Sequence, residues 1–213
     1  MQRLADLRRE YSKFSLDTAT VLADPIDQFQ KWFDESLKAE IPEPNAMTLA
    51  TVNDMGRPSS RIVLLKGIEA KQFIFYTNYL SKKGKELENN PACALTFFWP
   101  ELERQIRIEG ITDRVDAPTS DAYFRSRPRG SQIGAWASPQ SSVISERKLL
   151  DERSEKMEAK FKGLEQLPRP NQWGGYKVIP FLIEFWQGRT NRLHDRIQYT
   201  LTDGVWQIQR LAP

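Results

Sequence analysis

Hydrophobic residues recur at helical spacing in the first forty positions of the chain. The Asp24-Pro25 pair is a good helix start, because aspartate caps a first turn and proline fits the first helical position. The apolar positions that follow it are three or four residues apart: Ile26, Phe29, Trp32, Phe33 and Leu37. We therefore predict a helix there, with one face in the core.

After Pro42 and Pro44 the pattern changes to short runs rich in β-branched and aromatic residues. The turn Asn53-Asp54-Met55-Gly56 predicts a hairpin between the first two runs. Ile106 and Ile108 alternate with polar residues, as in a strand with one buried face. A loop with Pro168, Pro170 and Gly174-Gly175 is expected before the last three strands. The expected strands are 46–52, 59–66, 72–78, 93–99, 103–115, 177–187, 196–201 and 205–211.

Three further helices interrupt this strand pattern. Ser81 is placed to cap a short one that ends near Asn89, and two more are expected at 119–126 and 143–162. Six acids and six bases lie between Glu146 and Glu165, which is typical of a solvated surface helix. With no repeat and no long linker, the pattern predicts one α+β domain over 1–213, built on an antiparallel β-barrel with peripheral helices.

Composition narrows the chemistry, because the 213 residues include one cysteine, Cys93, and one histidine, His194. This excludes an internal disulfide and a Cys/His zinc cage, and nothing is spaced like a calcium loop, so we expect no metal site. No apolar run is long enough to span a membrane, and the first ten residues lack the apolar core of a signal peptide. We therefore expect a cytoplasmic protein with no membrane partner. The net charge of +3 is weak evidence for a nucleic-acid partner, and none is expected.

The common catalytic motifs are absent. There is no phosphate-loop motif, no glycine-rich dinucleotide motif and no nucleophile elbow, and a Ser-His-Asp triad would need His194, which lies among arginines. Arginines accompanied by hydroxyl and aromatic residues are the most distinctive feature instead.

One such cluster runs from Tyr123 to Gly134 and has arginines at 125, 127 and 129. Guanidinium groups grip phosphate through paired donors, and a helix opening after Pro128 would direct free backbone N–H groups at the same anion. A basic surface loop would give the same spacing, so both interpretations stay open.

A second cluster comprises Trp186-Gln187-Gly188 and then Arg192 to Arg196. On a strand, Arg192, His194 and Arg196 would share one face, and the two arginines would disfavour protonation of the histidine. An exposed face without function is the alternative. A third cluster, with Arg61 to Lys66, Tyr76 to Asn78 and Ser81 to Lys83, suits a second phosphate, although surface lysines and arginines at strand ends need no ligand.

In this order, the clusters resemble the pyridoxamine 5′-phosphate oxidase family. The resemblance runs from Leu7 to Pro213, and it rests on five tracts: Arg-Ile-Val-Leu-Leu-Lys, Glu-Arg-Gln, Ser-Arg-Pro-Arg-x-Ser-Gln-Ile-Gly-Ala-Trp, Ile-Glu-Phe-Trp-Gln-Gly and Arg-Leu-His-Asp-Arg. It implies a split β-barrel homodimer that binds FMN at the subunit interface. It also implies oxidation of pyridoxamine and pyridoxine 5′-phosphates to pyridoxal 5′-phosphate, in which hydride passes from substrate C4′ to FMN N5 and O2 reoxidises the flavin to give H2O2.

The resemblance also implies a role for each matching position. Arg192 and His194 would be catalytic and would lie against the substrate ring, and the N-terminal segment 1–20 would act as a mobile lid. The implied FMN residues are Arg61, Ile62, Val63, Leu64, Leu65, Lys66, Tyr76, Thr77, Lys82, Lys83, Gln105, Gln140, Ser141, Trp186 and Arg196. The implied substrate residues are Arg8, Tyr11, Lys66, Tyr123, Arg127, Ser131, Arg192 and His194.

The resemblance is incomplete at two positions: Lys82 stands where arginine is frequent, and Gly130 where an acid is common. Three alternatives stay open. One is another split-barrel flavoprotein, such as a flavin reductase, and another is a non-enzymatic flavin-binding module. The third is an RNA-binding β-domain, but the lysines lie mostly on helices with balanced charge rather than on a basic sheet face.

Overall fold

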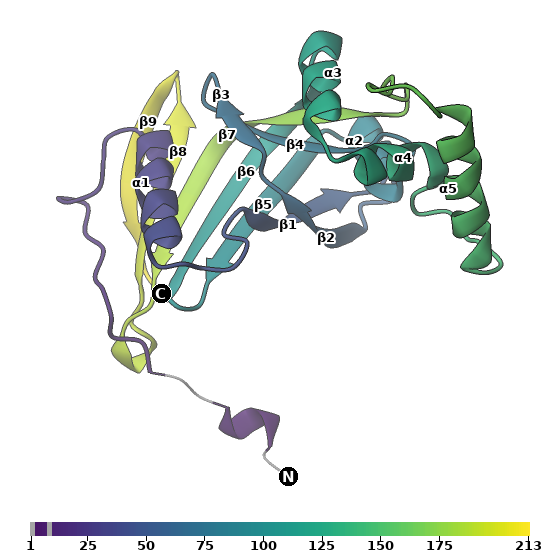
Figure 1. The fold of residues 1–213 in the computed structure, drawn as a ribbon. Helices are drawn as coiled ribbons and strands as arrows, with labels where there is room; N and C mark the ends of the chain where they lie inside the picture. The colour runs from purple at the N-terminus through teal and green to yellow at the C-terminus, as the bar shows by residue number, and fades with distance from the viewer. Residues whose placement is uncertain (1–2, 8–9) are drawn as a thin grey trace.

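Residues 3–7 and 10–213 are described by the computed structural model (Figure 1). In this part of the chain an antiparallel sheet curls into a half-barrel, with strand order β2-β1-β5-β6-β7-β4-β3, and β8 and β9 continue from β7. The strands are β1 (Ala46–Val52), β2 (Pro58–Leu64), β3 (Gly67–Glu69), β4 (Gln72–Asn78), β5 (Ala92–Trp99), β6 (Arg104–Arg114), β7 (Trp173–Gln187), β8 (Asp195–Thr202) and β9 (Val205–Leu211). The α+β split-barrel class expected from the sequence is thereby confirmed.

Helices lie at the two ends of this sheet. α1 packs near β8 and β9, whereas α3, α4 and α5 gather at the opposite end (Figure 1). No helix in the described residues is long and apolar enough to cross a membrane. The helices are α1 (Pro25–Lys38), α2 (Lys82–Asn89), α3 (Ala117–Ser126), α4 (Arg129–Ala137) and α5 (Lys148–Lys160), with short 3-10 turns η1 (Leu4–Asp6) and η2 (Thr190–Arg192).

The core lies inside the curl of the sheet and under α1. Phe29 and Trp32 of α1 are buried and meet Phe97 and Phe185 edge-on, with ring centroids 5.1 Å and 5.2 Å apart, respectively. Each such buried aromatic side chain stabilises the fold by roughly 1.5–3 kcal/mol relative to an exposed one. The helical spacing predicted for 26–33 is therefore the spacing of the face that covers the core.

Local signals predicted most elements well. Asp24 Oδ1 accepts the Ile26 N–H at the start of α1, and the 53–56 turn joins β1 to β2 as predicted. Ile106 and Ile108 are fully buried, as their alternation in the sequence predicted. α5 has no buried residue, which confirms a surface helix.

The structure also corrects several expectations. Leu37 is 53 % exposed because it lies off the buried face of α1. Gly174 and Gly175 are not in a loop, because they pair with Thr77 and Tyr76 and lengthen β7. The helix expected at 143–162 begins only at Lys148, and the short strand β3 was not predicted. Whether the whole chain is one domain stays a prediction.

Candidate functional site

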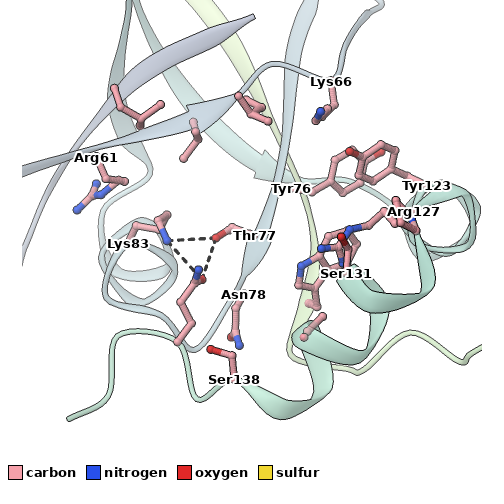
Figure 2. A pocket seen from close by; sticks show the side chains of 18 residues that line it. Arg61, Lys66, Tyr76, Thr77, Asn78, Lys83, Tyr123, Arg127, Ser131 and Ser138 are labelled. Atoms are coloured by element: carbon pink, nitrogen blue, oxygen red, sulfur yellow. Dashed lines mark hydrogen bonds between the residues drawn. The ribbon is translucent and has the colours of Figure 1, made fainter. Parts of the chain in front are cut away.

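A cavity of about 790 Å³ opens between the β2 and β4 strands and helices α3 and α4 (Figure 2). It collects residues from two of the arginine- and lysine-rich clusters predicted above. Its lining is Arg61, Ile62, Val63, Leu64, Lys66, Tyr76, Thr77, Asn78, Lys83, Tyr123, Arg127, Pro128, Ser131, Gly134, Ala135, Ser138, Gln140 and Trp173.

Arg61 and Lys83 form one basic side of this cavity (Figure 2). Lys83 Nζ donates to Thr77 Oγ1 at 3.3 Å and to Gln140 Oε1 at 3.4 Å. Burial and the nearby Arg61 charge lower the pKa of Lys83. Both causes disfavour the ammonium, and a bound anion would oppose both. This side of the cavity is therefore suited to bind a negatively charged group.

Glu86 of α2, which lies outside the cavity lining, fixes the position of Arg61. The buried carboxylate accepts the Ser59 and Thr51 hydroxyls, and Arg61 Nη2 lies 3.4 Å from Glu86 Oε2. Arg61 Nη2 also donates to Ser59 Oγ at 2.6 Å. Because several partners fix the guanidinium, it keeps one orientation at the cavity wall.

The start of α2 supports the same side. Ser81 accepts the Gly84 N–H at 3.3 Å and donates to the Asn78 carbonyl at 2.7 Å. A Cβ atom at Gly84 would lie 2.2 Å from the Tyr79 carbonyl oxygen, so only glycine lets the helix approach β4 this closely. The Ser81 cap and the glycine together set the position of Lys83.

Aromatic rings and Arg127 form the opposite side (Figure 2). Tyr76 and Tyr123 stack with centroids 3.9 Å apart, and Trp173 stacks on Tyr76 at 5.5 Å. Burial is the main cause that raises the pKa of Tyr76 to about 12, so its hydroxyl stays protonated. Lys66 and Ser131 border the same side.

The Arg127 guanidinium lies 4.5 Å above the Trp173 ring centroid. Among the described residues its Nη1 atom is buried without a hydrogen-bond partner, and burial lowers its pKa. An unpaired buried guanidinium nitrogen costs free energy unless a ligand accepts from it. This atom therefore supports an acceptor in the cavity, of the kind that a phosphate supplies.

The other two arginines of that cluster do not join Arg127. Arg129 donates to the Leu164 carbonyl and pairs with Glu158, so it ties α4 to α5, and Arg125 is exposed outside the cavity lining. Of the three alternating arginines, Arg127 alone lines the cavity, so the phosphate interpretation of this cluster applies to Arg127 and the surface interpretation to the other two.

A second set of predicted residues lies at the far end of β7, around Trp186. The His194 and Trp186 ring centroids are 4.6 Å apart, and Tyr11 lies 5.8 Å from Trp186 and 6.0 Å from His194. Gln105 and Arg196 flank Trp186 on the neighbouring strands β6 and β8. Arg196 also pairs with Glu184 at 2.7 Å.

His194 is held as a neutral imidazole. Its Nδ1 accepts the Arg189 N–H at 3.1 Å, which leaves Nε2 to carry the proton. Burial, and then the Arg192 charge, lower the pKa of His194, in the direction that the sequence predicted. The expected common strand face is wrong, however, because Arg192 lies in the η2 turn with φ of 61° and β8 begins only at Asp195.

Family models match most of the chain. The model described as "Pyridoxamine 5'-phosphate oxidase" matches residues 33–161, and the model described as "Pyridoxine 5'-phosphate oxidase C-terminal dimerisation region" matches residues 173–213. The chain belongs to the pyridoxamine 5′-phosphate oxidase family.

Relatives within this family are similar over their whole length. The chain is 56% identical over 210 residues to a protein of Acaryochloris marina named pyridoxine/pyridoxamine 5'-phosphate oxidase, covering 99% of this chain and 95% of that one. A protein of Burkholderia thailandensis with the same name is 56% identical over 216 residues and is covered completely, as is this chain. These names indicate an oxidoreductase.

Solved structures agree on the architecture. PhzG from Burkholderia lata, solved with tetrahydrophenazine-1-carboxylic acid, has a TM-score of 0.89 at 28% identity, with 96% of this chain and 100% of that chain covered. An FMN-binding protein of Nostoc punctiforme related to pyridoxamine 5'-phosphate oxidase has a TM-score of 0.69 at 17% identity, with 87% and 97% covered. The second likeness shows the fold alone.

Some residues implied by the family resemblance lie outside the cavity lining. Leu65 is buried in the core, while Lys82 and Ser141 are exposed, and Lys82 lies 3.9 Å from Glu86. Arg8 lies outside the described residues. Their assigned roles stay predictions.

Part of the lining lies outside the residues predicted from the sequence, most notably Trp173. This residue was assigned to a loop, so nothing indicated that its ring would stack under Arg127. Ser138 was not predicted either, whereas Asn78, Pro128, Gly134 and Ala135 lie in the predicted clusters and tracts without an assigned role. No group of three or more His, Cys, Asp or Glu side chains in the described residues is arranged to bind a metal ion.

Proposed function

We propose that this protein is an FMN-dependent oxidase that converts pyridoxamine and pyridoxine 5′-phosphates to pyridoxal 5′-phosphate, with O2 as the final acceptor. The observation that carries this proposal is the presence of two separate groups of anion donors on one cavity. Arg61 and Lys83 lie on one side, and Lys66, Arg127 and Ser131 on the other (Figure 2). A cofactor and a substrate that each end in phosphate need two such groups.

The residues present fit FMN. Its phosphate would be held by Arg61 and Lys83, and Thr77 and Gln140 would contribute polar contacts next to Lys83. The edge of β2 from Ile62 to Leu64 would lie along the flavin. When bound, FMN supplies the redox chemistry, because it accepts a hydride from the substrate and returns the electrons to O2 as H2O2.

The other side of the cavity would hold the substrate phosphate. The unpaired Nη1 of Arg127 gains an acceptor there, and the Ser131 hydroxyl and the Lys66 ammonium add donors. The stacked rings of Tyr76, Tyr123 and Trp173 exclude water behind the guanidinium, which strengthens its attraction for phosphate.

The second set, around Trp186 and His194, needs a second copy of the chain. Trp173 is the first residue of β7 and lies on the cavity, whereas Trp186 is the second-last residue of the strand. At about 3.3 Å per residue, the two are roughly 40 Å apart along the strand. One small ligand cannot contact both ends. We propose a two-fold homodimer in which residues Tyr11, Trp186, Arg192 and His194 of one copy complete the cavity of the other. The match of residues 173–213 to a dimerisation region supports this.

In this arrangement the chain orients the substrate and places its charges. Arg192 and His194 would lie against the substrate ring, and the neutral imidazole can hold a proton at Nε2 beside the reacting carbon. No activated nucleophile is needed.

The test is conversion of pyridoxamine 5′-phosphate by the purified holoprotein. We expect yellow protein that releases FMN on denaturation and forms equal amounts of pyridoxal 5′-phosphate and H2O2. Unphosphorylated pyridoxamine is the control substrate and should react far more slowly. Equal turnover of the two would contradict the phosphate group assigned to Arg127.

Two substitutions separate the proposed cofactor and substrate roles. Arg61→Ala should weaken FMN binding, because it removes a donor from the Lys83 side of the cavity. Arg192→Ala should impair turnover and leave FMN bound, because Arg192 is assigned to the substrate ring and not to FMN. The opposite result would mean that the two roles are exchanged.

A flavin-dependent oxidase with another substrate is the second candidate, and the likeness to PhzG favours it. That structure was solved with tetrahydrophenazine-1-carboxylic acid, a ligand that carries a carboxylate and no phosphate. Turnover of a tetrahydrophenazine carboxylic acid without turnover of pyridoxamine 5′-phosphate would support this candidate over the first.

A further inference from the structure

Glu103 connects the N-terminal segment to the loop that carries Arg192 and His194. It ends the turn between β5 and β6, is 2 % exposed, and has a left-handed backbone with φ of 54°. A glutamate is uncommon in that conformation, and burial of a carboxylate is costly without donors. Both features call for specific contacts.

The Glu103 carboxylate receives two donors from the chain immediately after Tyr11. The backbone N–H groups of Ser12 and Lys13 both donate to Oε2, at 2.8 Å and 3.0 Å. Hydrogen bonds to a charged acceptor are stronger than neutral ones, and these two fix successive peptide groups. They therefore restrict where the Tyr11 side chain can lie.

The main chain of Glu103 is hydrogen-bonded to the end of β7, next to the loop that carries His194. Its carbonyl oxygen accepts the Gly188 N–H at 2.7 Å and the Gln187 Nε2–H at 3.1 Å. Gly188 begins the loop that leads to Arg192 and His194. Glu103 thus contacts both the segment that follows Tyr11 and the residue that begins the loop to His194.

Close packing at Gly188 gives independent support. A Cβ atom there would lie 2.7 Å from Cγ of Tyr11, so the ring rests directly on the glycine backbone. Real Cβ contacts are never that short, and any side chain at 188 would displace the ring. The seat of Tyr11 is therefore formed by Gly188, Trp186 and His194.

We propose that Glu103 is a positioning residue that holds Tyr11 against Trp186 and His194. This inference rests on the proposed function only for its effect on substrate, because Tyr11 and His194 are proposed substrate contacts there. The structural part, the seating of the ring, can be measured without any substrate.

The first test is an NMR measurement on FMN-loaded protein with isotope-labelled histidine. His194 is the single histidine, so one ring signal reports its surroundings. Glu103→Ala should shift this signal in the same way as Tyr11→Ala. In both variants the tyrosine ring no longer lies against the imidazole. In the double variant Glu103→Ala should add no further shift. An unchanged signal in Glu103→Ala would overturn the proposal.

The second test is steady-state kinetics with pyridoxamine 5′-phosphate. Loss of the two charge-assisted hydrogen bonds in Glu103→Ala should raise KM on the order of tenfold with FMN affinity unchanged. Glu103→Gln keeps an acceptor oxygen and should restore most of the loss. In a Tyr11→Ala background Glu103→Ala should have no effect on KM, whereas a purely structural role of the turn would keep its effect.

Gly188→Ala tests the seat of Tyr11 without changing Glu103. The added methyl group should displace Tyr11 and reproduce both the histidine shift and the KM increase. Wild-type behaviour of Gly188→Ala in both measurements would contradict the seat described above. If the wild-type protein failed to oxidise pyridoxamine 5′-phosphate, the proposed function would fail, while the NMR test would still decide the role of Glu103.

Discussion

His194 shows how the fold sets the state of a single side chain. The Arg189 N–H donates to Nδ1, so a proton there would break the hydrogen bond. The sequence predicted a neutral histidine from its flanking arginines. The structure agrees on the direction, but burial is the larger cause and Arg196 does not contribute, because it pairs with Glu184. Burial of one side chain depends on distant segments and could not be derived from its neighbours in the sequence.

His194 should therefore titrate below its ordinary pKa of 6.5. The unfolded chain binds more protons than the folded one between the lowered pKa and 6.5. The stability that folding gains by keeping His194 neutral is thus fully present above pH 6.5. It is lost as the pH falls through the folded-state pKa. Histidine NMR should give a midpoint below 6.5, and Arg192→Ala should raise it only partly, since burial remains. Arg189→Ala is the control and should leave it unchanged. A wild-type midpoint at or above 6.5 would contradict the assignment.

Secondary-structure elements were predictable where their signals are local. Capping residues and turn residues act within four positions, so α1, α2 and the hairpin of β1 and β2 were evident from the sequence. Gly174 and Gly175 were misassigned because glycine is unfavourable in strands. They are strand residues here because β4 pairs with them across a separation of nearly a hundred positions, as in the pair of Thr77 with Gly174.

The cap of α2 should matter for cofactor binding as well as for stability. Ser81→Ala removes the acceptor for the Gly84 N–H and a neighbour of Lys83, so it should cost about 1 kcal/mol of unfolding free energy and weaken FMN binding. Asp24→Ala removes the cap of α1 together with the Lys71 ion pair, far from the cavity, and is the control for FMN affinity. Chemical denaturation and FMN titration measure the two effects. Equal FMN affinity in the two variants would show that the α2 cap has no part in the site.

At the scale of the whole molecule, the sequence placed the right residue types in the right order but could not give their separation. Arg127 and His194 were both assigned to the substrate. The structure puts Arg127 beside the first residue of β7 and His194 beside Trp186, near its last. The length of β7 follows from its pairing with β4, β6 and β8 together. The proposed site, which uses residues from both ends, would therefore need two chains, and no pattern in one chain can show that.

Two inactive variants should restore activity when they share a dimer. Arg127→Ala should disable the cavity of its own chain, and His194→Ala the residues its chain gives to the partner's cavity. A heterodimer purified through two different affinity tags then has one cavity with both lesions and one intact. It should show about half the wild-type activity per dimer, as two-fold symmetry requires. The control is a heterodimer of Arg127→Ala with Lys66→Ala, which damages both cavities and should stay inactive. If the first pair were as inactive as the control, each cavity would have to be completed within its own chain, and the shared site would be excluded.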